Sequence, residues 1–142
     1  MIWKPGIDEH PEAMLIRLNL LLFALLVVHT LDHALNQPAR DLPATGSVAA
    51  LAGFAIVAAA AVLALRRSPA APAAAVVSGL ATALGLVAIH LTPRWLDAIS
   101  DPLWEFGADP LTWTLTLAPL VAALALASFG ARELGSRAAA TA

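Results

Sequence analysis

The chain contains no cysteine and few charged residues. Without cysteine, a disulfide framework, a thiolate-bound metal and a thiol nucleophile are all excluded. Charged residues make up 13% of the 142 positions and hydrophobic residues 60%, whereas a typical soluble domain has about 25% and about 45–50%. The formal net charge of −2 provides no basic surface, so nucleic acid is not expected as a partner.

The excess of apolar residues is larger than a soluble globule of this size can enclose, so we predict an integral membrane protein in contact with the lipid bilayer. Residues 46–65, 68–89 and 110–131 carry no charge, and each run exceeds the roughly 18 residues that indicate a spanning helix. A fourth apolar stretch, 13–35, has its polar residues near its two ends. Acids precede this stretch and no clear cleavage site follows it, so we expect a retained helix rather than a signal peptide.

The predicted fold is therefore an all-α, four-helix transmembrane bundle that forms one domain over residues 1–142. We expect helices at about 13–36, 46–66, 71–92 and 111–133. The turn at residues 66–69 is short and contains Pro69, which predicts a hairpin of the second and third helices. In the outer loop between the third and fourth helices, the spacing of Trp95, Leu96, Ile99 and Leu103 predicts a short interfacial helix.

The basic residues predict the orientation. Lysine and arginine in short flanking segments are retained in the cytoplasm, and six of the 8 fall on one side of the predicted spans: Lys4, Arg17, Arg66, Arg67, Arg132 and Arg137. Only Arg40 and Arg94 lie on the other side, which also carries most of the acids. We therefore expect both termini in the cytoplasm, and the alanine-rich composition favours a bacterial plasma (inner) membrane.

Small residues recur at four-residue spacing in three of the predicted helices, as in Ala49 with Gly53, Ala81 with Gly85, and Ala123 with Ala127. Such pairs let helix backbones approach closely in lipid, so we expect them to pack within the bundle or between copies of the chain. Pro119 should kink the fourth helix, which can open a pocket near it.

Three histidines and one aspartate form the only cluster in the sequence that indicates a chemical function. His29, Asp32 and His33 share one face at the outer end of the first helix, because positions i, i+3 and i+4 lie together on a helix. His90 ends the third helix on the same side of the membrane. Three imidazoles and a carboxylate are plausible ligands for zinc, copper or non-haem iron.

Other interpretations of this cluster stay open. His90 with His29 or His33 can ligate haem b between two helices, and the cluster can instead relay protons. The zinc-protease pattern His-Glu-x-x-His is absent. Polar residues near a helix end can also be solvated without any function, with Asp32 paired to Arg40 or Arg94, which are the candidate charge partners at the rim.

Three functional hypotheses follow. The first is a membrane protein with a metal or haem site that serves redox chemistry, with His29, His33 and His90 as ligands and Asp32 as ligand or supporting partner. The second is a non-catalytic subunit that docks to another membrane protein or forms a homo-oligomer through its small-residue faces. The third is a lipid or quinone binder in a space opened by Pro119 and lined by Trp104 and Trp113.

Overall fold

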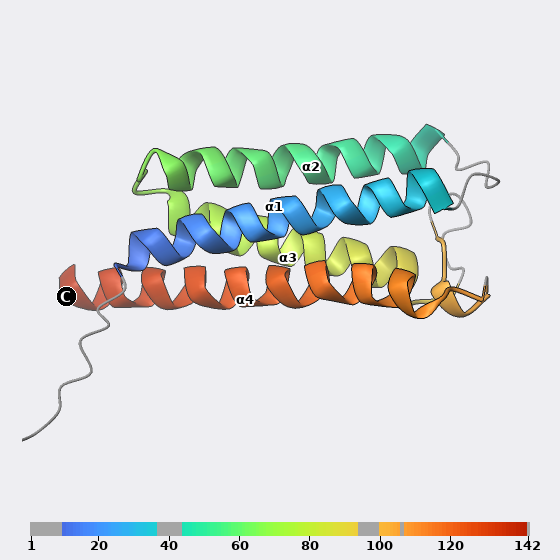
Figure 1. Ribbon diagram of the computed structural model, residues 1–142. Coiled ribbons are helices and arrows are strands. Elements are labelled where there is room, and N and C mark those ends of the chain that lie inside the picture. Colours follow the sequence, from blue (N-terminus) through green and yellow to red (C-terminus); the bar gives the residue numbers. More distant parts are fainter. Residues whose placement is uncertain (1–9, 37–43, 94–99, 106, 142) are drawn as a thin grey trace, which may run out of the picture.

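The computed structural model describes residues 10–36, 44–93, 100–105 and 107–141, and its regular secondary structure in those ranges is helical. Four α-helices, α1 (Pro11–Asn36), α2 (Ala44–Leu65), α3 (Ala71–His90) and α4 (Pro110–Thr141), run up and down side by side (Figure 1). A 3₁₀ turn, η1 (Leu103–Glu105), precedes α4. The predicted all-α fold with four helices is confirmed.

The helices have the composition of membrane spans. Helices α1, α3 and α4 are each long and apolar enough to cross a bilayer, and α2 contributes a shorter apolar segment, Ala50–Leu65, among its described side chains. Large apolar side chains cover the outside of the bundle; Leu35, Leu51 and Leu84 are 72%, 69% and 68% exposed. Polar side chains are buried inside, including Asn19, Ser78 and Thr116, each at 0% exposure. An apolar exterior around a partly polar interior suits contact with lipid.

The beginning of α1, the α2–α3 turn and the end of α4 lie at one end of the bundle (Figure 1). Arg67 has a φ of 49° and closes α2 in a Schellman motif, because the Ser68 amide donates to the carbonyl of Leu63. The Arg67 side chain lies 3.4 Å from the Glu12 carboxylate at the start of α1. Arg137 of α4 donates to the Pro69 carbonyl at 3.0 Å, so Glu12, Arg67 and Arg137 gather at this end.

The closest approach between helices is that of α3 and α4. A Cβ atom added at Gly79 would overlap the backbone oxygen of Ala123 and the side chain of Ala127, and one added at Gly130 would overlap the Pro72 carbonyl. Ala123 and Ala127 are both buried, as expected for a packing pair. Gly53 and Gly85 behave differently, because a Cβ added at either would meet no atom within 4 Å. These two glycines therefore do not serve close helix packing within the chain.

Helix α4 begins at a clear cap. The Asp109 carboxylate accepts the Thr112 amide hydrogen at 2.8 Å, and this bond lowers the pKa of Asp109. The helix continues to Thr141, past the expected end near 133, since alanine and arginine dominate its last turns and no proline stops it. Pro119 is buried within α4, which is continuous across it.

Most of the predicted interfacial helix falls on residues 94–99, outside the described residues, together with Trp95. The described part of that loop, Ser100–Glu105, contains only η1. Arg94 and Arg40, the predicted charge partners at the rim, also lie outside the described residues.

Candidate metal centre

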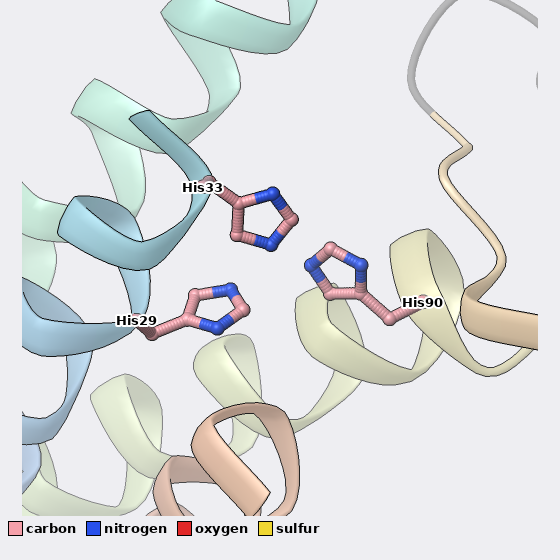
Figure 2. A group of neighbouring side chains, drawn as sticks. All are labelled: His29, His33 and His90. Atoms are coloured by element: carbon pink, nitrogen blue, oxygen red, sulfur yellow. The ribbon is translucent and has the colours of Figure 1, made fainter. Parts of the chain in front are cut away.

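His29, His33 and His90 converge at the end of the bundle opposite the α2–α3 turn (Figure 2). One ligand nitrogen from each ring lies within 4.8 Å of the others. The ring centroids are 4.6 Å apart for His29 and His33, 5.1 Å for His29 and His90, and 5.0 Å for His33 and His90. Among the described residues, this triad is the group of His, Asp or Glu side chains that can hold a metal ion.

Helix periodicity and topology together position the triad. His29 and His33 are four residues apart on α1, so their side chains stack along one face of the helix. His90 is the last residue of α3, which runs in the same direction as α1 because one antiparallel helix, α2, separates them. The two helices therefore end at the same level, and His90 reaches the α1 pair from across the bundle (Figure 2).

The backbone after α3 orients His90. The chain folds back so that the Asp101 amide donates to the Ile89 carbonyl at 2.8 Å, and Nδ1 of His90 lies 3.1 Å from the Asp101 carbonyl oxygen. Since a carbonyl only accepts, the proton of His90 sits on Nδ1 and the lone pair is on Nε2. Histidines that ligate metals usually donate their other N–H to such a carbonyl or carboxylate.

Asp101 also supplies a buried negative charge beside the triad. It is 4% exposed, and its Oδ2 lies 3.9 Å from Nδ1 of His33. That separation is too long for a direct hydrogen bond but short enough for a strong electrostatic effect in a buried setting. Sequence reasoning missed Asp101 as a site residue: it was one acid among several in the outer loop, and no spacing rule connects it to His90.

His29 lies one helical turn further from the end of α1 than His33. It is 7% exposed, and it bonds to the backbone of Leu115 on α4. Its other ring nitrogen, Nδ1, is buried and has no hydrogen-bond partner among the described residues. A buried nitrogen without a partner is costly, and a bound cation would satisfy it.

Asp32 lies on the same side of α1 as the histidine pair, but its carboxylate contacts a different helix. Its Oδ2 accepts a hydrogen bond from the Thr112 hydroxyl of α4 at 3.3 Å, and the residue is 6% exposed. The three-residue group that can share an ion does not include it. The structure thus places Asp32 as a link between α1 and α4, beside the triad.

The triad is close to the dimensions of a metal site. Three atoms no more than 4.8 Å apart have a common point at most about 2.8 Å from each, against about 2.0–2.1 Å for a zinc–imidazole bond. Side-chain movements of less than about 1 Å would therefore complete a three-nitrogen site. A fourth position would stay open for water or another ligand, as in catalytic rather than structural sites.

A cavity of about 360 Å³ lies directly beside the triad, between α1, α2 and α3. Its wall includes all three histidines and Asp101, and most of the remaining wall is apolar. No residue of α4 lines this cavity, so it is not the expected space near Pro119, and neither Trp104 nor Trp113 lines it.

Comparison with known proteins gives no functional assignment, so the function is argued from the triad. A scan against protein-family models, a search of curated proteins and a search of solved structures each find no match to this chain.

Proposed function

We propose that this chain is a multi-pass protein of a bacterial plasma membrane that binds one transition-metal ion through His29, His33 and His90. The observation that carries the proposal is the convergence of three imidazole nitrogens from two helices at a buried point. His29 and His90 are buried, and Nδ1 of His29 has no hydrogen-bond partner among the described residues, which costs stability. A metal ion bound by the triad would satisfy that nitrogen.

Imidazole ligands suit zinc, copper and iron, and an open coordination position suits chemistry on a bound molecule. A bound ion would supply Lewis acidity and, in the case of copper or iron, one-electron redox chemistry. The residues around it have separable tasks. His90 is held by the Asp101 carbonyl, and Asp32 links α1 to α4. The Asp101 carboxylate, 3.9 Å from His33, would partly offset the positive charge of a bound ion.

A bare ion fits this geometry better than haem b. Two histidines that ligate a haem lie on opposite faces of the macrocycle, which separates their rings. Here each ring is next to both of the others, and the His29 and His33 rings make an edge contact at a centroid distance of 4.6 Å. Such an arrangement favours one shared point of coordination.

We further propose that α2 is a fourth membrane span. The end of the bundle that contains the α2–α3 turn then faces the cytoplasm, and both termini lie there. The triad then lies at the extracytoplasmic surface. The basic residues Arg66, Arg67 and Arg137 support this orientation, because all three are at the end of the bundle away from the triad. Asp32 as an additional ligand, and Arg40 and Arg94 as rim partners, stay predictions.

The test is metal binding by the purified full chain in mild detergent. We expect near-stoichiometric zinc, copper or iron by elemental analysis. After chelation, added Co²⁺ should give visible absorption bands typical of low-coordinate cobalt with nitrogen ligands. His90→Ala should abolish both signals, while His10→Ala should change neither, since His10 is exposed and lies at the other end of the bundle.

Circular dichroism and gel filtration of each variant separate loss of the site from loss of the fold. If folded wild-type protein, expressed with metals available, neither contains metal nor binds Co²⁺, the metal proposal is wrong. A docking subunit would then be the better hypothesis, and its test is co-purification of a partner or of a second copy.

A further inference from the structure

The cavity beside the triad has one polar end and a long apolar wall. His29, His33, His90 and Asp101 form the polar end. Apolar side chains such as Leu26, Phe54 and Leu86 line most of the rest. Its volume of about 360 Å³ lies in the range of small-molecule sites, which combine an apolar wall with a few convergent polar groups.

Two glycines create this space. Gly53 of α2 and Gly85 of α3 both line the cavity, and a Cβ at either position would meet nothing within 4 Å. A larger side chain at either position would therefore extend into the cavity, with no clash at its Cβ. The small size of these residues is not needed for helix packing, in contrast to Gly79, where the neighbouring helix leaves no room.

The cavity opens on the outer surface of the bundle between α2 and α3. Ala50 and Ala81, which are exposed, belong to its wall, whereas no residue of α4 does. Exposed apolar side chains lie next to these alanines in the sequence, Leu51 after Ala50 and Leu80 before Ala81, so the opening faces the region expected to contact lipid. A molecule dissolved in the bilayer can enter there without passing through water.

We propose that this cavity is the substrate site of the metal centre, and that it takes a lipid-soluble molecule with one small oxygen-bearing head and an apolar body. This inference rests on the proposed metal site. The head would occupy the open coordination position, and the body would lie along Leu26, Phe54 and Leu86. Apart from Thr30 and Thr82, the wall away from the histidines and Asp101 is apolar. A molecule that is polar along its whole length would therefore leave most of its other polar groups without partners.

Two hydroxamic acids with the same metal-binding head test this site. Octanohydroxamate has an apolar chain and acetohydroxamate has only a methyl group. Each is titrated into Co²⁺-loaded protein in one detergent, and the change in the cobalt absorption bands reports binding. The comparison is made among wild type, Gly85→Leu, whose side chain would enter the cavity, and Gly135→Leu, a matched change in α4 at a position where an added Cβ also meets no atom within 4 Å.

In Gly85→Leu, we expect octanohydroxamate to bind about tenfold more weakly, since the added side chain occupies its volume, while acetohydroxamate is unaffected. Gly135→Leu should leave both affinities unchanged. Partitioning into micelles is the same for all three proteins and cancels in the comparison.

The two proposals fail in different ways. If Co²⁺ binds but Gly85→Leu weakens both hydroxamates equally, or weakens neither, the cavity is not the substrate site and holds only bilayer acyl chains. If folded wild type contains no metal and gives no cobalt bands, the metal centre itself is refuted.

Discussion

At the scale of single residues, the cluster depends on Asp101 as much as on the histidines. Its carbonyl fixes the proton of His90, and its carboxylate lies 3.9 Å from His33. Substituting the Asp101 side chain removes the carboxylate near His33. It preserves the hydrogen bond to His90, because that carbonyl belongs to the backbone. The contribution of the charge can therefore be measured separately.

We expect Asp101→Asn to weaken metal binding by about 10- to 100-fold, which is the usual cost of losing a supporting carboxylate. Competition with a chelator of known affinity would measure the change. Glu105→Gln is the control: Glu105 is exposed on the same loop, so its loss tests whether any negative charge nearby has the same effect. Equal effects of the two variants would contradict a specific role for Asp101.

Thr112 connects two helices through a single hydroxyl, which donates to the buried Asp32 carboxylate. Thr112→Val keeps the shape and removes this bond, so we expect a loss of about 1–3 kcal/mol in the free energy of unfolding. Thr114→Val is the matched control, since the Thr114 hydroxyl is exposed and bonds only within α4, to the Pro110 carbonyl. Denaturation in mixed micelles would compare the free energies of unfolding of the two variants. Equal values would rule out a stabilising hydrogen bond between Thr112 and Asp32.

The histidines of the site could be predicted from the sequence, whereas their surroundings could not. Four-residue spacing joined His29 to His33, and alternation of helix direction brought His90 to the same level. Asp32 shows the limit of spacing arguments, because a face spanning i to i+4 is wide enough for its members to contact different helices. Asp101 depends on how an irregular loop folds back onto α3, and no periodic pattern encodes that.

At the scale of helices, α3 carries two glycines with opposite roles. Gly79 lies against the backbone of α4, while Gly85 lines open space. The four-residue pattern in the sequence identified Ala81 with Gly85 as a packing pair but could not show which face of α3 meets α4. Small side chains permit close packing, and the same property leaves a cavity where no helix approaches.

A pair of identical substitutions in α3 tests this difference. Gly79→Ala should lower the free energy of unfolding by about 1–3 kcal/mol, because the new methyl group forces α3 and α4 apart. Gly85→Ala should be neutral or stabilising by up to about 1 kcal/mol, since alanine favours helix and has room. Thermal unfolding followed by circular dichroism would distinguish them. If Gly79→Ala is as stable as wild type, the close contact is absent.

At the scale of the whole molecule, the two ends of the bundle differ in chemistry. Arginine and glutamate side chains meet at the α2–α3 turn, and the triad occupies the other end. The number of helices and their directions were predictable from apolar length and turn residues. The lateral arrangement was not, since nearly uniform apolar helices carry little information about which neighbours they choose.

Because the chain has no cysteine, single-cysteine variants can report the orientation without a background signal. We expect Ser136→Cys, near the end of α4, to be protected from a membrane-impermeant maleimide added to intact cells. Glu105→Cys, beside the triad, should be labelled. Permeabilised cells provide the control for reactivity of both sites. The reverse pattern would place the triad in the cytoplasm and overturn the predicted orientation.

Helices α1 and α3 pack mainly against α2 and α4 and make few contacts with each other. The triad brings these two helices together, so an ion held by His29, His33 and His90 would cross-link α1 and α3. Binding free energy would then add directly to the stability of the folded chain and would rise with the logarithm of the free metal concentration. In a cell short of metal, the helix ends around the cavity would separate more easily, and metal supply would thereby determine how long the protein survives.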